Sequence, residues 1–147
     1  MTEMFSISGS KNVALNKPAY MRFTYDVWHA ALAVDGNDGN KNRRIGCAQS
    51  VSKKRSFHHW WVDLEANYRV HAVKVAHSKS SCKTRLKEVS IFVDLEECVT
   101  MTMNETSQQY NCIKPMVGRQ VSVVVFAKQL CLCELEVLAD PDPVKGE

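Results

Sequence analysis

The chain has 147 residues, of which 45% are hydrophobic and 24% are charged, and its formal net charge is +3. This length suits one domain with a hydrophobic core, and so small a net charge gives no indication of nucleic-acid binding. No apolar run reaches the ~20 residues that span a bilayer and no signal peptide opens the chain, so we predict no membrane insertion. On this basis the chain is either a cytosolic protein or an excised ectodomain.

Alternation of apolar and polar residues predicts half-buried strands along most of the chain. Ahead of them, residues 29–34 are compatible with a single helical turn before Asp35. The period of two is clearest over residues 70–75, 89–95 and 121–125. Residues 130–138 form the predicted closing strand, with Cys133, Leu135 and Val137 on one side. Several short strands without a long amphipathic helix predict an all-β sandwich.

The strand pattern also sets the predicted domain boundaries. Residues 1–10 are predicted to be an N-terminal extension, and residues 11–139 to form the domain. Residues 140–147 contain two prolines and three acidic residues. This composition is typical of a C-terminal tail or a linker to a neighbouring domain.

Six cysteines in a small domain are typical of a secreted protein. Asn104 opens an Asn-Glu-Thr acceptor triplet for N-glycosylation, which has meaning in the secretory pathway alone. Together these features favour an extracellular location. A zinc site that combines Cys82 with His77, or with the His58–His59 pair, is an alternative use of one cysteine, but no metal-binding spacing supports it.

The tryptophans allow two interpretations. Trp60 and Trp61 are adjacent in a predicted strand, so their side chains face opposite sides and at least one belongs to the core. Stacking on a sugar ring is the alternative, and we favour a structural role for both. Trp28 lies in a loop, where capping of the core is favoured over a surface role.

Five segments together resemble the F-type lectin domain: Asn12–Tyr20, Ala30–Asn37, Trp60–Leu64, residues 118–123 and Leu130–Val137. The resemblance extends over nearly the whole predicted domain. It implies a jelly-roll β-sandwich of the galactose-binding-domain-like superfamily, whose loops bind a ligand and catalyse no reaction. It also implies two disulfides, Cys47–Cys133 and Cys98–Cys112. Cys82 and Cys131 either pair with each other or remain unpaired.

The turn that begins at Asp35 is rich in oxygen ligands and glycine, as a calcium site requires, although a plain turn has the same composition. It lacks the EF-hand pattern. The resemblance implies one structural Ca²⁺ ion, held by side chains and backbone carbonyls of two distant segments. The implied ligands are Leu32, Asp35, Asn37, Gly46, Cys133 and Glu134.

The fucose-binding residues of the family are largely replaced in this chain. The family's His falls near Gln49, its Arg-x-Asp falls on Ser78, Lys79 and Ser80, and its adjacent cysteines fall on Ser81-Cys82. The second Arg alone is retained, as Arg85. Lys79 cannot reproduce the bidentate geometry of an arginine, so ordinary fucose binding is not expected.

Basic residues surround these positions. Lys53, Lys54 and Arg55 follow Gln49, His58 and His59 lie just beyond, and further basic residues are Lys41, Arg43, Arg44, Lys79, Lys83, Arg85 and Lys87. A charge cluster is often only a solvated face. The alternative is a site for an anionic partner, strengthened at mildly acid pH by histidine protonation.

The sequence therefore predicts an extracellular, non-enzymatic recognition domain that binds cell-surface glycans, fucosylated or sulfated or sialylated, with altered specificity. The alternative is a protein-interaction or adhesion domain of a larger receptor, which has lost fucose binding and recognises an acidic protein. No nucleophile elbow, catalytic carboxylate pair or phosphate loop is present, so an enzyme is disfavoured. The sequence makes no prediction of the oligomeric state.

Overall fold

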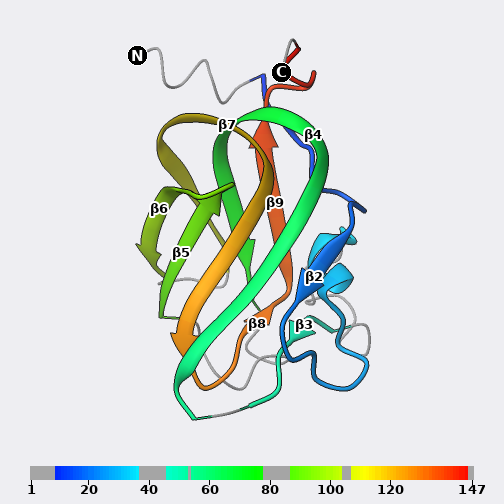
Figure 1. The fold of residues 1–147 in the computed structure, drawn as a ribbon, viewed down its shortest axis with the longest axis vertical. Coiled ribbons are helices and arrows are strands. Elements are labelled where there is room, and N and C mark those ends of the chain that lie inside the picture. Colours follow the sequence, from blue (N-terminus) through cyan, green and yellow to red (C-terminus); the bar gives the residue numbers. More distant parts are fainter. Residues whose placement is uncertain (1–8, 37–45, 53, 78–86, 104–106, 146–147) are drawn as a thin grey trace.

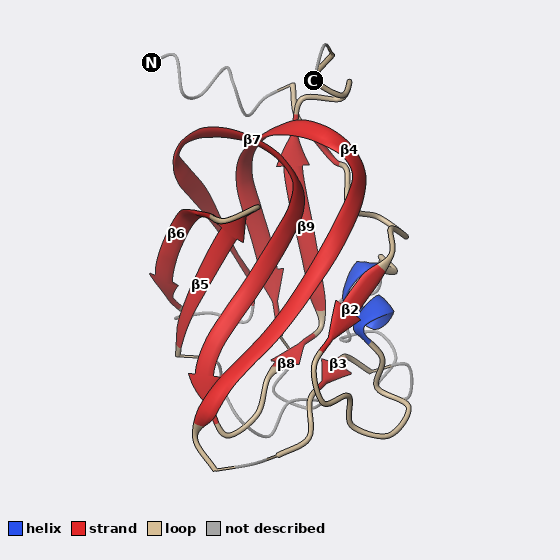
Figure 2. Cartoon of the chain, viewed as in Figure 1, coloured by secondary structure: helices blue, strands red, loops and turns tan. Residues whose placement is uncertain are grey.

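The computed structural model describes residues 9–36, 46–52, 54–77, 87–103 and 107–145. In chain order its elements are β1 (Lys11–Asn12), β2 (Ala19–Met21), η1 (Ala30–Val34), β3 (Ala48–Gln49), β4 (Ser56–Ala76), β5 (Glu88–Val93), β6 (Glu96–Thr102), β7 (Ser107–Ala127), β8 (Cys131–Leu132) and β9 (Glu134–Ala139). The 3-10 turn η1 is the helical element of this part of the chain (Figure 2). The predicted all-β class and the helical turn before Asp35 are confirmed. No helix among these residues has the length and apolar character needed to cross a membrane.

The two long strands β4 and β7 run through both layers of the sandwich and curve over one end of it (Figure 1). The first part of β4 pairs with β2 and with the second part of β7, which in turn pairs with β5. The second part of β4 pairs with β9 and with the first part of β7. Between the two parts, the register of β4 and β7 shifts between Asp63 and Tyr68. One continuous antiparallel ladder thereby supplies both layers.

The core lies between these layers and is built from inward-facing residues of both. Trp60, Val62, Leu64, Ile91, Val121 and Val123 from one layer and Val73, Val75, Leu135 and Val137 from the other are all fully buried. Each large apolar side chain that leaves water in this way stabilises the fold by about 1.5–3 kcal/mol. The short β3–β8 sheet packs against this core through Ala48 and Leu132, so the core also holds the strand ends in place.

Three strand predictions need correction. Leu95 is 97% exposed, because Asp94 adopts a left-handed conformation (φ 53°) in the turn between β5 and β6. The closing strand is interrupted at Cys133, which separates β8 from β9. Residues 70–75 are not half-buried, since Val70, Ala72, Val73 and Val75 are all inaccessible. A register shift between Val70 and Ala72 breaks the alternation there.

The residues just after β9 lie against the domain. The Asp140 amide donates to the carbonyl of Arg69, and the Val144 amide donates to that of Asn67. The buried imidazole of His71 also lies 2.7 Å, Nε2 to Oδ1, from the Asp140 carboxylate. The segment that follows the predicted boundary at residue 139 is therefore anchored to the turn region of β4 as far as Val144.

Candidate functional site

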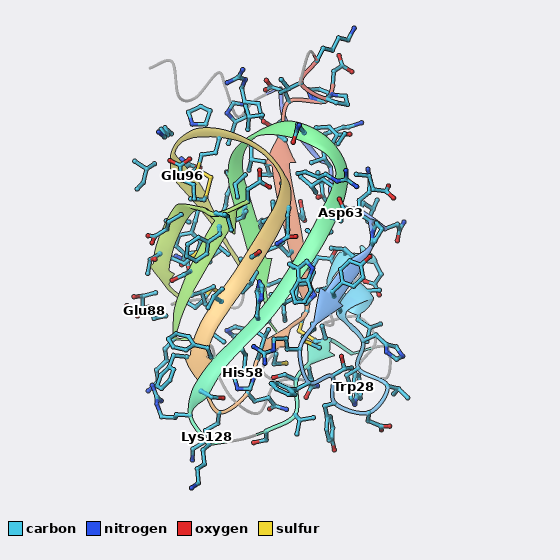
Figure 3. All side chains as sticks on the ribbon, viewed as in Figure 1. Trp28, His58, Asp63, Glu88, Glu96 and Lys128 are labelled. Carbon is cyan, nitrogen blue, oxygen red and sulfur yellow. A yellow bond between two sulfur atoms is a disulfide. The ribbon has the colours of Figure 1, made fainter. Side chains whose placement is uncertain are left out.

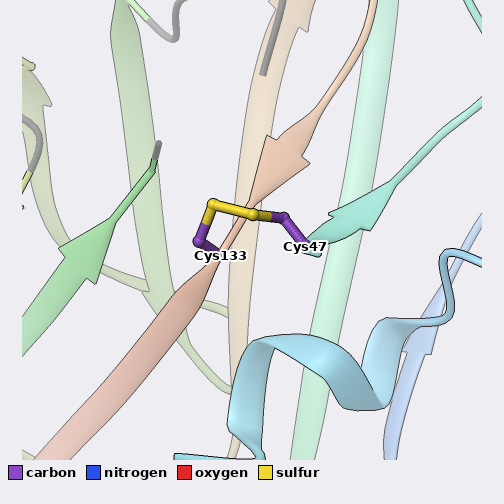
Figure 4. Close-up of a disulfide and its surroundings, with 2 residues drawn as sticks. All are labelled: Cys47 and Cys133. Atoms are coloured by element: carbon purple, nitrogen blue, oxygen red, sulfur yellow. A yellow bond between two sulfur atoms is a disulfide. The ribbon is translucent and has the colours of Figure 1, made fainter. Parts of the chain in front are cut away.

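A disulfide joins the segment after η1 to the junction of β8 and β9. Cys47 directly precedes β3, Cys133 directly precedes β9, and both are fully buried (Figure 4). A second disulfide, Cys98–Cys112, joins β6 to β7. Both predicted pairings are confirmed.

Cys131 is also disulfide-bonded, and its predicted candidate partner, Cys82, lies outside the described residues. The sulfur atoms of Cys47, Cys131 and Cys133 lie within 4.8 Å of one another. Because all three are oxidised, they supply no thiolate for a zinc ion.

Glu134 is the centre of a carboxylate cluster next to this disulfide. It is 5% exposed, and its Oε2 accepts a hydrogen bond of 2.9 Å from the amide of Gly36. Its Oε1 is buried without a hydrogen-bond partner among the described residues. Burial raises the pKa of Glu134 to about 8, and the nearby Asp35 carboxylate adds to this effect. Two carboxylates, one of which has an unsatisfied buried oxygen, are donors suited to a hard cation such as calcium.

The fold brings the other predicted metal ligands toward this cluster. Leu32 lies in η1, and Asp35 directly follows it as the C-terminal cap. Gly46 directly precedes Cys47 of the disulfide, Cys133 is its other half, and Asn37 lies outside the described residues. The hydrogen bond from Gly36 to Glu134 and the Cys47–Cys133 bond therefore tie both ends of the intervening segment to consecutive residues.

Two features make glycine necessary at position 46: its backbone conformation and its contact with Trp28. Its φ of +67° is left-handed, and a Cβ added to it would overlap the Trp28 ring. The half-buried Trp28 thus packs directly on the Gly46 backbone. Capping of the core by Trp28 stays a prediction.

Gly46→Ala is expected to lower the free energy of unfolding by about 2–4 kcal/mol, from backbone strain and overpacking combined. Denaturant titration of the variant measures this loss. Gly9→Ala is the matched control, because nothing lies within 4 Å of the Cβ that it adds. Equal stability of the two variants would contradict the assigned contact with Trp28.

Polar and basic side chains occupy the end of the molecule where β4 begins. Gln49 lies in β3, with its amide bonded to the carbonyl of Trp28 and its side-chain oxygen 3.5 Å from Nε2 of Gln129. Lys54 and Arg55 are exposed, and the Arg55 guanidinium lies 5.2 Å from the centre of the Phe126 ring. Lys128, which the sequence analysis did not single out, lies at the same end (Figure 3). We call Gln49, Lys54, Arg55 and Lys128 the basic end.

The remaining predicted ligand-binding residues lie outside the described part of the chain. They are Lys53, Ser78, Lys79, Ser80 and Arg85, and the same holds for Lys41, Arg43, Arg44, Lys83 and the glycosylation acceptor Asn104. Lys87 is described and exposed, next to β5.

His58 is a structural residue and not part of a basic surface. It is 1% exposed, with Nδ1 2.9 Å from the hydroxyl of Ser50 and Nε2 3.0 Å from the carbonyl of Ala127. The Leu130 amide donates to the same hydroxyl. This buried network joins the end of β3, β4 and the segment before β8. It therefore holds in place the segments from which the side chains of the basic end project. The alternation that buries Trp60 also buries His58, and this signal was available in the sequence.

His59 takes up a proton less readily than a free histidine. Burial lowers its pKa, and the positive charge of Arg22 lowers it further. Its ring lies 4.5 Å from that of Trp61, centre to centre. The burial of His58 and the lowered pKa of His59 both count against the expectation that these two histidines strengthen anion binding as pH falls.

The two adjacent tryptophans have different environments. Trp60 is fully buried and its indole donates to the Ala30 carbonyl at 3.0 Å, so the structural role is confirmed for it. Trp61 lies on the outer face of the sheet, half-buried, where it stacks with Tyr20 of β2. An open groove of about 440 Å³ runs beside this ring pair.

The protein is a β-sandwich with polar side chains gathered at one end and connections that are fixed by disulfides. This arrangement is typical of a lectin-like recognition domain. Residues 32–123 match the model of the NedA-like galactose-binding domain family. The chain belongs to this family, and within it has the characteristics of an F-type lectin domain. Domains of this kind are recognition modules, so the comparisons support the prediction that this domain is non-enzymatic.

Similar proteins support this assignment. The chain is 31% identical to Fucolectin-6 of Anguilla japonica, with 76% of this chain and 63% of that protein covered. It is 29% identical to the pentraxin fusion protein of Xenopus laevis, with 94% and 36% covered. The structure of an F-lectin from Morone saxatilis serum superimposes with a TM-score of 0.76 at 26% identity, covering 88% of this chain and 47% of that chain. The chain thus spans less than two thirds of each of these relatives.

Proposed function

We propose that this chain is an extracellular, calcium-stabilised lectin domain that binds anionic glycans, sulfated or sialylated, at the basic end. The observation that carries the proposal is the chemistry of that end. Gln49 stands where the fucose-binding family has a histidine, and exposed cations lie at the same end of the molecule, before β4 and after β7. An arginine can bind a sulfate or carboxylate through two parallel hydrogen bonds, and lysines add positive charge at its margin. The disulfides support an extracellular location.

Calcium binding is the second part of the proposal. The residues that would hold the ion are Asp35, Glu134 and the carbonyls of Leu32, Gly46 and Cys133, with Asn37 from the adjoining segment. The unsatisfied Oε1 of Glu134 and its raised pKa both support it, because a cation relieves the repulsion between two close carboxylates. The role of the ion would be structural: it neutralises this cluster and stabilises the segments that carry Gln49.

A triple variant tests the basic end. Lys54→Ser, Arg55→Ser and Lys128→Ser together are expected to weaken binding of a sulfated glycan by about 1–2 kcal/mol, roughly tenfold. Salt dependence of binding should flatten as well, because fewer cations contribute. The matched control is Lys11→Ser with Lys74→Ser, two exposed lysines of β1 and β4 in the other layer. Equal binding by both variants would remove the basic end from the site.

A glycan array, run with calcium and then with a chelator, tests the function as a whole. Saturable binding to sulfated or sialylated glycans supports the proposal, and selective binding to neutral fucosylated glycans contradicts the proposed specificity.

The adhesion alternative has one observation in its favour. Phe57 and Phe126 are 69% and 49% exposed and contact each other edge to face, as rings in a protein interface do. Absence of any glycan hit, together with a tight protein ligand lost on Phe57→Ser, would favour this alternative.

A further inference from the structure

We propose that the groove beside β2 is a second carbohydrate subsite, which stacks a pyranose ring on Tyr20 and Trp61 and takes an acidic substituent of that sugar at Arg22. The inference rests on the proposed glycan-binding function, but it places a ligand at residues outside the basic end.

The groove has the size and lining of a small-molecule site. It is about 440 Å³ in volume and is lined by Tyr20, Met21, Thr24, His29, Ala31 and Trp61, among others. Sites for small ligands commonly range from about 300 to 1,000 Å³ and combine apolar walls with a few polar groups. Here the rings supply the apolar wall, and the Thr24 hydroxyl and the exposed His29 imidazole supply hydrogen-bonding groups.

The aromatic wall is held in place by the sheet. Tyr20 and Trp61 are directly opposite each other in the β2–β4 register, with ring centres 5.7 Å apart and planes inclined by 26°. His59 lies two residues before Trp61 on the same face of β4. Its ring centre is 4.5 Å from that of the indole, so it helps to hold Trp61 in place. Tyr20 remains 48% exposed. A preorganised, accessible aromatic surface suits the apolar face of a pyranose, because little side-chain freedom is lost on binding.

Charge selects the kind of sugar. Arg22 is exposed and lies two residues beyond Tyr20, with its guanidinium 5.0 Å from the centre of the Phe23 ring. It forms no ion pair within the described ranges. The nearest carboxylate along this face of β4, Asp63, is already bound by the Arg119 guanidinium at 2.7 and 3.1 Å. Positive charge is thus left uncompensated beside the rings. A sugar that carries a carboxylate or sulfate complements it, and a neutral sugar does not.

The groove is distinct from the cations of the basic end, although the loop that lines it is also hydrogen-bonded to Gln49 through the backbones of Tyr25 and Trp28. Trp61 lies five residues along β4 from Ser56, a distance of about 16 Å at ~3.3 Å per residue. One monosaccharide cannot occupy both positions. An acidic oligosaccharide could span them, and each subsite would then contribute to its affinity.

Nuclear magnetic resonance with ¹⁵N-labelled protein tests the subsite directly. The probes are the methyl glycoside of N-acetylneuraminic acid and, as a neutral reference, methyl galactoside. We expect saturable shifts of the Trp61 indole N–H with the acidic sugar and at least about fivefold weaker binding of the neutral one, about 1 kcal/mol. Tyr20→Ser and Arg22→Ser should each weaken acidic-sugar binding at least threefold. Leu95→Ser, which removes an exposed apolar side chain from the turn between β5 and β6, should leave it unchanged.

The possible outcomes separate this inference from the proposed function. If array glycans bind and are lost on substitution of the basic end, while the Trp61 signal stays fixed, the second subsite is wrong and the lectin function stands. If no glycan binds at all, the proposed lectin function and the second subsite are both wrong. Equal affinity for the two sugars would overturn the role of Arg22. Because the side chain of Arg22 is exposed, Arg22→Ser keeps the test valid even if Tyr20→Ser impairs folding.

Discussion

Replacing Cys47 and Cys133 together with alanine is expected to lower the free energy of unfolding by about 4–5 kcal/mol. The two residues are 86 positions apart, and the chain-entropy model assigns a cross-link of this span roughly that stabilisation. For the Cys98–Cys112 pair, 14 positions apart, the same model predicts about 3 kcal/mol. Urea titration of both double variants gives the comparison, and alanine is used because both positions of the first pair are fully buried.

The first double variant should also lose its response to calcium, because Cys133 directly precedes Glu134. The Cys98→Ala, Cys112→Ala variant serves as the control, since it removes a disulfide far from that carboxylate in the chain. Two results would contradict the role assigned to the Cys47–Cys133 disulfide. One is a larger loss of stability when the Cys98–Cys112 pair is removed, and the other is an intact calcium response without Cys47–Cys133.

Removal of calcium is expected to produce the second large effect. For an ion that binds the folded state alone, each tenfold excess of free calcium over its dissociation constant adds about 1.4 kcal/mol to stability. A thermal scan in chelator should therefore show a clearly lower midpoint than one in excess calcium. Glu134→Gln keeps an acceptor for the Gly36 amide but removes the charge, so it should abolish the difference between the two scans.

The same carboxylate predicts the pH dependence. The pKa of Glu134 is raised from 4.5 to about 8, so the metal-free folded protein holds a proton that the unfolded chain releases. Stability of the metal-free protein should accordingly fall as pH rises from 4.5 to about 8. Calcium must displace this proton, so its apparent affinity should rise by up to tenfold per pH unit below pH 8 and level off above it.

Isothermal titration calorimetry in buffers of different ionisation enthalpy measures the released proton. Glu136→Gln is the control, because Glu136 is a nearby acid on β9 that only modulates the pKa of Glu134. Calcium binding without proton release at pH 7, or a chelator scan that matches the calcium scan, would show that this cluster is not the ion site.

Much of the framework was predictable from the sequence. Period-two alternation located the strands, and the resemblance to F-type lectins supplied the two disulfide pairings, which no spacing rule could select. Failures occurred where backbone geometry overrides alternation. Leu95 continues an apolar pattern into a turn, and the register shift between Val70 and Ala72 buries both faces of β4.

The site was less predictable, because it depends on contacts between distant segments. Lys128 joins the basic end although it is more than seventy positions from Lys54 in the printed sequence. The pairing of Tyr20 with Trp61 depends on the register of β2, a strand of three residues with no clear periodic signal. The position of His58 was the exception, since the alternation that placed Trp60 inside applied equally to it.

The attachment of Gly36 and Cys47 to the neighbouring residues Glu134 and Cys133 has an evolutionary consequence. Both exits of the segment between Gly36 and Cys47 are attached to adjacent residues where β9 begins, independently of the sequence that joins them. Apart from Gly46, which packs on Trp28, and Asn37 of the proposed calcium site, substitutions between those exits are expected to have little effect on folding. Selection there can act mainly on binding. A domain with this arrangement can change its ligand faster than its architecture, and the same two exits offer a defined position for grafting a foreign peptide.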